Sequence, residues 1–258
     1  MSKEKEFNKY ELQGPDYHYR QIEKKNRWTF NAYLFARYYI QLELIKKIIY
    51  KINNEIIKIL DVGCGDGVLF YLFKNKIKKK KNLELYGVDT SEIALKVAKM
   101  KNPGIIFRNA NVYELPFESN YFDLIFSSDV IEHVSKPDKM LSEIKRVGKR
   151  NSFIIISTPI RFTEEHLDKN HYHEFFPEEF KTLLNKFFTT LKIIKSHRLV
   201  YYLLYKKKST IFGKTKYLYH NLINIISIYF NRNPFLKIKI SDNEQYTYMF
   251  GIGKIEKK

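Results

Sequence analysis

The residues with the clearest chemical potential lie in the stretch "IKILDVGCGDGVLF", residues 57–70, where three glycines follow an apolar run. Glycine lets the backbone turn sharply and lets a ligand sit against bare peptide. A loop between the carboxyl end of a strand and the amino end of a helix is also where open α/β sheets bind ligands. We therefore interpret residues 61–67 as a ligand-binding loop.

The spacing within this loop differs from that of the usual phosphate-binding loops. Asp61, Gly63, Gly65 and Gly67 form the pattern D-x-G-x-G-x-G, whereas dinucleotide folds have G-x-G-x-x-G and P-loops end in G-K-S/T. The carboxylates of Asp61 and Asp66 would repel a phosphate. They suit a ligand that carries an ammonium and a sulfonium group.

A further carboxylate lies at the end of the next predicted strand. Asp89 ends the next predicted strand, "LELYGVD", 22 residues after Gly67. A carboxylate at that point can accept hydrogen bonds from both hydroxyls of a ribose. The loop and Asp89 together predict a pocket for a nucleoside without a phosphate chain.

Acid–base groups gather in two further stretches, "SSDVIEHV" at 127–134 and "HLDKNHYHEFFPEEF" at 166–180. In a turn after the strand, Asp129, Glu132 and His133 are spaced by three and four residues and would share one face. Carboxylate and imidazole groups can take the proton from a hydroxyl acceptor. We interpret Asp129, His133 and His171 as the candidate catalytic residues.

Two other interpretations of these stretches stay open. In the first interpretation, Glu132 and His133 only shape a turn, and the histidines before residue 177 cap the following helix or pack in the core. In the other, Asp129, Glu132, His133 and His171 bind a divalent cation, whose identity this ligand set does not fix. The prediction assigns no metal.

The elements that must position these groups alternate between strand and helix from residue 56 onward. Strands are expected at 56–62, 83–89, 105–110, 121–129, 152–159, 190–199 and 244–255, and helices at 67–81, 91–101, 137–149 and 177–188. Such alternation implies a parallel sheet covered by helices on both faces.

The two ends of the chain add to this core. Residues 1–26 are polar and expected to be loose at the start, and residues 27–50 form an amphipathic pattern without Pro or Gly, typical of a helix. Residues 201–243 look like an insertion before the last strand. Within it one helical face is apolar and the other polar; the apolar positions are Leu218, Leu222, Ile225, Ile226 and Tyr229.

Taken together, these motifs resemble the class I S-adenosylmethionine-dependent methyltransferases of the type 11/type 23 superfamily, which includes glycan and ubiquinone-biosynthesis O-methyltransferases. The resemblance is carried by "ILDVGCGDG", "YGVDTSEIALKVAK", "NANVYELPFESNYFDLIFSSDVIEHV" and "MLSEIKRVGKRNSFIIISTP" and covers about residues 55–190. It implies an α/β, Rossmann-like seven-stranded sheet whose last strand is antiparallel. The expected organisation is an N-terminal helical lid, residues 1–50, and a cofactor-binding domain, residues 51–258.

The resemblance also implies residues around the cofactor S-adenosylmethionine: Asp61, Gly63, Gly65, Asp89, Asn111, Val112, Ser128 and Arg37. The glycines would line the methionine part and Asp89 the ribose. Asn111 stands where relatives usually have Asp beside the adenine, and an amide can still accept through its oxygen. Arg37, from the lid, would meet the cofactor carboxylate.

The implied reaction is methylation of an oxygen on a sugar, a lipid-linked or another small acceptor. One alternative is a metal-assisted RNA 2′-O-methyltransferase, which the formal charge of +18 favours, although the basic residues are spread along the chain. Another is a binder of S-adenosylmethionine without catalysis. Contact with an anionic membrane surface through the insertion is a further interpretation.

Composition sets the broad class. A chain of 258 residues with 44% hydrophobic residues can bury a large core. It has no apolar run of membrane-spanning length and no apolar segment near residue 1 of the kind that directs secretion. Its one cysteine, Cys64, fits a reducing compartment. We therefore expect a cytoplasmic protein.

Overall fold

A seven-stranded mixed sheet forms the centre of the computed structural model, which describes residues 9–24, 28–74, 82–164, 168–211, 214–236 and 244–256. The strand order is β3-β2-β1-β4-β5-β9-β6, and β9 runs antiparallel to both of its neighbours. The strands are β1 (Ile56–Val62), β2 (Asn82–Asp89), β3 (Ile106–Asn109), β4 (Phe122–Ser128), β5 (Gly148–Pro159), β6 (Thr189–Arg198) and β9 (Tyr246–Lys254). The predicted fold class is confirmed.

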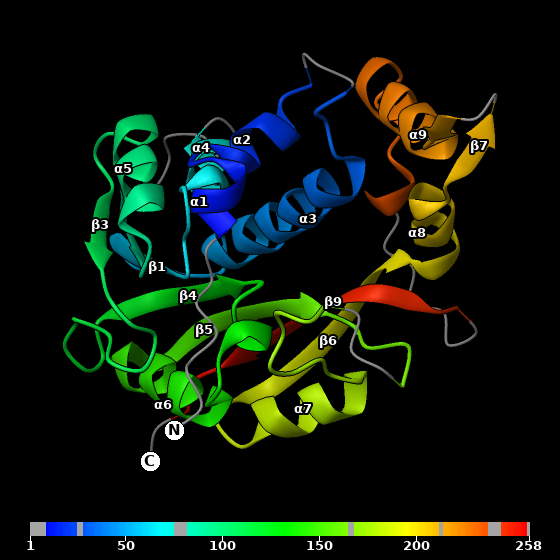
Figure 1. The fold of residues 1–258 in the computed structure, drawn as a ribbon. Helices are drawn as coiled ribbons and strands as arrows, with labels where there is room; N and C mark the ends of the chain where they lie inside the picture. The colour runs from blue at the N-terminus through cyan, green and yellow to red at the C-terminus, as the bar shows by residue number, and fades with distance from the viewer. Residues whose placement is uncertain are drawn as a thin grey trace, which may run out of the picture.

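Helices cover both faces of the sheet (Figure 1). They are α1 (Lys9–Gln13), α2 (Tyr17–Ile22), α3 (Ala32–Ile49), α4 (Val68–Lys74), α5 (Glu92–Lys101), α6 (Pro137–Val147), α7 (Pro177–Asn185), α8 (Leu199–Lys206) and α9 (Leu218–Tyr229), with 3-10 turns η1 (Ile131–His133) and η2 (Pro234–Leu236). One apolar layer lies between the sheet and α3, α4 and α5, and the other between the sheet and α6 and α7.

The central strands carry long buried runs because both of their faces are covered. Six of the seven residues of β4 are buried, and "IIIST" supplies the buried run of β5. Such strands read as continuous hydrophobic runs instead of alternating ones. Strands β1, β2 and β4 run parallel to one another. Their carboxyl ends, at Val62, Asp89 and Ser128, therefore lie at the same edge of the sheet.

The N-terminal segment is more ordered than its polar sequence suggested. Residues 9–13 and 17–22 form short helices, and Tyr10 and Tyr19 are buried. The expectation of a loose start is therefore wrong for residues 9–24, while residues 1–8 lie outside the described part of the chain. Helix α3 begins at Ala32, because the Asn31 side chain accepts the Leu34 N–H at 2.9 Å and caps the first turn.

The insertion contains α8, a small hairpin of β7 (Ser209–Ile211) and β8 (Lys214–Lys216), helix α9 and η2. In Figure 1 α9 lies at an outer edge of the molecule, beyond α8. Tyr205 of α8 and Phe235 of η2 pack with Phe30 and Ala32 in a separate small core. Among the described residues, no helix is long and apolar enough to cross a membrane. The division of the chain at residue 50 stays a prediction.

Candidate functional site

The glycine loop follows β1 in a conformation that glycine adopts easily. Gly63, Gly65 and Gly67 have φ of +77°, +52° and +76°, in the left-handed region. The N–H groups of Gly63 and Cys64 donate to the Val88 carbonyl at 2.8 and 2.9 Å, which ties the loop to β2. A β-carbon on Gly63 would lie 2.2 Å from Val130 Cγ2. The loop therefore presents peptide where no side chain fits.

The Asp89 carboxylate lies directly against this loop. One oxygen accepts the Gly65 N–H at 2.8 Å, and the other accepts the Ser91 N–H at 2.9 Å. Burial raises the pKa of Asp89, while these backbone donors act in the opposite direction. A carboxylate has about four acceptor positions, so each oxygen keeps capacity for a ligand hydroxyl. The structure thus places the bare peptide and the carboxylate at one point, as the predicted nucleoside pocket requires.

The two acids of the glycine loop, Asp61 and Asp66, are both buried but have different surroundings. Asp61 is 3% exposed, and burial together with the charge of Asp89 raises its pKa well above the usual range. Asp66 is fully buried and binds His18 of α2 twice: its carboxylate accepts the His18 backbone N–H at 3.1 Å and lies 3.1 Å from His18 Nδ1. Asp66 thus anchors the N-terminal segment.

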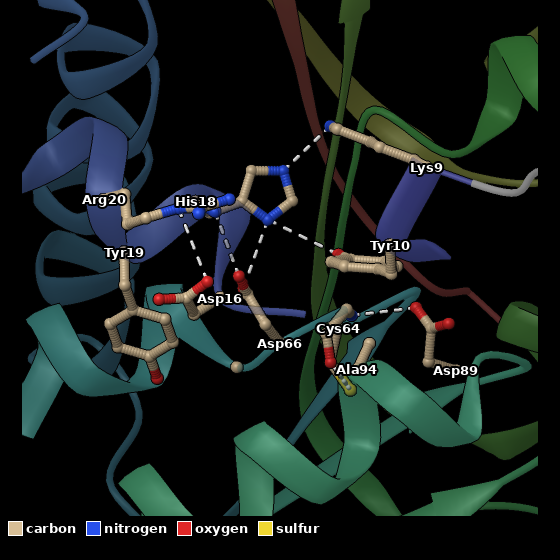
Figure 2. A network of polar contacts seen from close by, with 12 residues as sticks. Lys9, Tyr10, Asp16, His18, Tyr19, Arg20, Cys64, Asp66, Asp89 and Ala94 are labelled. Atoms are coloured by element: carbon tan, nitrogen blue, oxygen red, sulfur yellow. Dashed lines mark hydrogen bonds and ion pairs between the residues drawn. The ribbon is translucent and has the colours of Figure 1, made fainter. Parts of the chain in front are cut away.

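The N-terminal segment covers the loop through three residues (Figure 2). Lys9 Nζ lies 2.9 Å from His18 Nε2 and the Tyr10 hydroxyl 3.4 Å from His18 Nδ1. Because an ammonium only donates, His18 Nε2 accepts and Nδ1 carries the proton toward Asp66. Burial and the charge of Lys9 lower the pKa of His18, which agrees with a neutral ring.

Tyr10 reaches the glycine loop itself. A β-carbon built on Gly65 would lie 1.9 Å from the Tyr10 hydroxyl, so that hydroxyl rests against the Gly65 peptide. A nucleoside bound to Gly65 and Asp89 must therefore sit beside Tyr10 or displace it. Sequence reasoning missed Lys9, Tyr10 and His18, since no local pattern reports a contact between residues 48 apart.

The residues predicted around the adenine lie next to Asp89. The Ala110 N–H donates to the Asp89 carbonyl at 3.1 Å, which brings the following turn to the edge of the site. The Asn111 side-chain oxygen accepts the Tyr113 N–H at 3.0 Å, and Val112 packs on the apolar layer below.

The end of β4 carries two more predicted residues. The Ser128 hydroxyl is buried and has no hydrogen-bond partner among the residues that the structure describes, an unusual state that a bound ligand would relieve. Asp129 has a φ of +56° and forms an ion pair with Arg37 of α3. Its carboxylate also accepts the Tyr248 hydroxyl at 2.9 Å. Arg37 thus reaches the end of β4 from α3, and its partner there is Asp129.

A separate cluster brings together Glu132, His133 and His171. Their ligand atoms lie within 4.8 Å of one another, and the two imidazole rings are 4.8 Å apart. The Glu132 carbonyl accepts the N–H groups of Tyr172 and His173 at 2.8 and 3.2 Å, which fixes the two loops together. Asp129 is not in this group, so the four-ligand set considered from the sequence is not assembled in the described part of the chain.

Hydrogen bonds orient both imidazoles of this cluster. His171 Nδ1 lies 2.7 Å from the buried Glu174 carboxylate, and His133 Nδ1 lies 3.3 Å from the Asn170 carbonyl. Each Nδ1 faces an acceptor, which fixes the orientation of its ring. Burial, and next the charge of His171, lower the pKa of His133 to about 4. The cluster can therefore accept a hydrogen bond from a substrate hydroxyl at neutral pH.

Glu132 has an unusual charge environment. It is 1% exposed, accepts the Thr158 hydroxyl at 3.0 Å, and burial raises its pKa to about 7. The charges of Arg37 and Lys9 act in the opposite direction on its pKa. Two cations, Lys9 of α1 and Arg37 of α3, therefore already act on this carboxylate.

The family model that matches this chain covers the part that contains the glycine loop and Asp89. A family model described as "Methyltransferase domain" matches residues 60–156. The ubiquinone/menaquinone biosynthesis C-methyltransferase UbiE of Campylobacter jejuni is 34% identical over 102 residues, 39% of this chain and 43% of the relative. The uncharacterized protein MJ0638 of Methanocaldococcus jannaschii is 35% identical over 104 residues, 40% of this chain and 41% of the relative. The chain thus matches less than half the length of these relatives.

Solved structures share the fold over most of the chain. A possible histamine N-methyltransferase from Thermotoga maritima superposes with a TM-score of 0.54 at 18% identity, covering 87% of this chain and 92% of that one. Phosphoethanolamine N-methyltransferase 2 of Haemonchus contortus, solved with phosphomonomethylethanolamine and S-adenosylhomocysteine, gives 0.58 at 18% identity, covering 94% and 60%. At such identities the likeness concerns the fold.

Proposed function

We propose, starting from the membership of residues 60–156 in the methyltransferase domain family, that this chain transfers a methyl group from S-adenosylmethionine to an oxygen of a small acceptor. The family resemblance predicted from the motifs is confirmed by this match. The relatives and neighbours act on carbon and nitrogen according to their names, so the acceptor atom is inferred from the site.

The observation that carries the proposal is the hydrogen bond from the Gly65 N–H to Asp89 at 2.8 Å. It sets a ribose-binding carboxylate beside peptide that has no side chain. Asp61, Gly63, Gly65 and Asp89 would hold the methionine and ribose parts. Bound there, the sulfonium supplies an activated methyl group, so the protein mainly has to align the acceptor and exclude water.

The choice of oxygen rests on the Glu132, His133 and His171 cluster. A hydroxyl must lose its proton as it accepts a methyl group. Both imidazoles are oriented with Nδ1 toward a fixed acceptor, and a positioned imidazole is the side chain that most often takes the proton of such a hydroxyl. Asp129, at the end of β4, would lie between this cluster and the cofactor. Sugars and lipid-linked or other small alcohols present such a hydroxyl.

Two measurements on the full chain test the proposal. Calorimetry with S-adenosylmethionine tests binding, and mass spectrometry of candidate acceptors tests for the added mass of one CH₂. We expect saturable binding and methylation of an alcohol. Binding without any transfer would leave only a binder, and methylation at nitrogen or carbon would refute the choice of oxygen.

A further inference from the structure

Helix α9 has its polar side toward the protein. Asn224 is fully buried and Ser227 is 2% exposed. The Asn224 side-chain oxygen accepts the Ala32 N–H at 3.2 Å and the Tyr205 hydroxyl at 3.0 Å, and its amide donates to the Phe30 carbonyl at 2.5 Å. These bonds fix the orientation of the helix. They reverse the usual arrangement, in which the apolar side of a helix faces the core.

The opposite side of α9 is therefore apolar and faces outward. Leu218 is 43% exposed, Leu222 51%, Tyr229 70% and the following Phe230 68%. Helix α8, which packs on α9 through a stack of Tyr205 on His220, adds two more exposed apolar residues. We name these six residues the α8–α9 face: Val200, Leu203, Leu218, Leu222, Tyr229 and Phe230. Exposed apolar groups gathered in this way mark interaction surfaces.

The segment that carries this face is rich in basic residues. Residues 199–241 contain eight basic residues and no Asp or Glu: Lys206, Lys207, Lys208, Lys214, Lys216, Arg232, Lys237 and Lys239. Lys206, Lys207 and Lys208 follow directly after α8 and are exposed. The acid near the start of α8, Glu244, is paired with Arg198 at 2.7 Å. Exposed lysines therefore directly follow one of the two helices that carry the outward apolar residues.

We propose that the α8–α9 face docks on the surface of an anionic lipid bilayer. Leucines with flanking aromatic and basic residues are the composition of a helix that lies in the interface of a membrane. Each lysine near an anionic surface strengthens binding by electrostatic attraction. Trp28 is 67% exposed and lies two residues before Phe30, whose carbonyl accepts the Asn224 amide. Tryptophan and tyrosine are favoured at the depth of the lipid headgroups.

A second copy of the chain fits this face less well. Self-association would bring two segments together that each carry eight basic residues and no acid. Like charges at an interface oppose binding, whereas anionic headgroups neutralise them. The docking surface is independent of the methyl-transfer reaction, because it concerns neither the glycine loop nor the histidine cluster.

Co-sedimentation with vesicles tests the proposal on the full chain. We expect binding to phosphatidylglycerol/phosphatidylcholine vesicles, much weaker binding to pure phosphatidylcholine, and loss of binding as salt rises. Leu222→Glu should weaken binding roughly tenfold, since it removes an apolar contact and adds repulsion. Met100→Glu is the control: it makes a similar change at a residue of α5 that is 69% exposed.

A second pair of variants tests the charges. Lys207→Glu with Lys208→Glu should weaken binding to anionic vesicles by roughly tenfold or more. Lys96→Glu with Lys99→Glu, two exposed lysines of α5, changes the net charge equally and should have little effect. Equal effects of the two pairs of variants would show that vesicle binding depends on net charge alone, and would overturn the proposal. Sedimentation velocity showing a dimer that Leu222→Glu abolishes would overturn it as well, in favour of a second copy.

Discussion

The hydroxyl of Tyr10 lies 1.9 Å from where a β-carbon of Gly65 would stand. This contact couples the N-terminal segment to the loop that would hold the cofactor. Replacement of Gly65 therefore affects two things at once, the left-handed backbone and the position of Tyr10.

We expect Gly65→Ala to destabilise the protein and to weaken binding of S-adenosylmethionine. A φ of +52° costs a residue with a side chain roughly 1–2 kcal/mol, and the new methyl group must displace Tyr10. Gly104→Ala is the matched control, because Gly104 also has a positive φ, +85°, but nothing within 4 Å of the added carbon. Chemical unfolding and calorimetry measure both effects. Identical losses in the two variants would mean that Tyr10 does not contact the loop in solution.

Asp89→Ala should weaken binding of S-adenosylmethionine by about 10- to 100-fold, the range for hydrogen bonds to a charged group. Turnover of bound cofactor should change much less, since Asp89 would contact the ribose and not the reacting methyl group. Asp138→Ala, at an exposed acid of α6, controls for the loss of one negative charge. Thermal melting of the free protein separates a folding defect from a binding defect. Equal affinity in variant and parent would rule out the ribose assignment.

His171→Gln should lower turnover at saturating cofactor by roughly 100-fold, the lower end of what a positioned base contributes. Affinity for S-adenosylmethionine should stay unchanged, because His171 lies on the acceptor side. His173→Gln is the control in the same loop: His173 stacks on Phe175 and is not in the cluster. If both variants kept full activity, the cluster would have no part in the reaction.

Chelators should leave activity intact. The three ligand atoms of Glu132, His133 and His171 are close enough for a cation, but Arg37 and Lys9 already act on Glu132. Lys9 stays largely protonated at neutral pH, because burial, with the charge of Arg37, lowers its pKa only to about 8. A divalent ion would have to enter against both charges. Complete inhibition by EDTA, reversed by one particular divalent ion, would show instead that the cluster is a metal site.

His197 should make the protein sensitive to acid. It is fully buried, its Nε2 lies 3.0 Å from the Tyr33 carbonyl and its Nδ1 2.8 Å from the Ser196 hydroxyl, and burial lowers its pKa to about 3. In the unfolded chain His197 therefore binds a proton as the pH falls below about 6.5, whereas in the folded protein it stays neutral at that pH. Its contribution to stability is complete above about pH 6.5 and is lost as the pH falls toward 3.

The variant His197→Asn tests this dependence, because Asn also tolerates the φ of +61° at this position. We expect the free energy of unfolding of the variant to fall less steeply than that of the parent between pH 6.5 and 3. Urea unfolding at a series of pH values gives both curves. Parallel curves would show that the histidine already titrates normally in the folded protein.

The sequence predicted the parts of the site that depend on local spacing. The glycine loop and Asp89 are short motifs at strand ends, and parallel strands bring their carboxyl ends to one edge, so their meeting follows from the fold. The start of α5 also follows from local sequence, because Ser91 directly precedes the helix and its side chain accepts the Ala94 N–H at 3.3 Å.

Contacts between distant residues could not be read in the same way. The bond between Tyr248 and Asp129 joins positions 119 apart, and that between His18 and Asp66 joins positions 48 apart. The pattern of α9 showed a polar and an apolar face, but only the Ala32 N–H and the Phe30 carbonyl decide that the polar face is the inner one.

The place of β9 between β5 and β6 makes completion of the site depend on residues 246–254, which follow every other described strand along the chain. A product of premature termination before residue 246 would keep the glycine loop and Asp89. It would lack Tyr248, leave the Asp129 carboxylate with its Arg37 ion pair, and deprive β6 of its only neighbour among the described strands. A stop codon between residues 199 and 246 should therefore yield chains that cannot assemble the acceptor side.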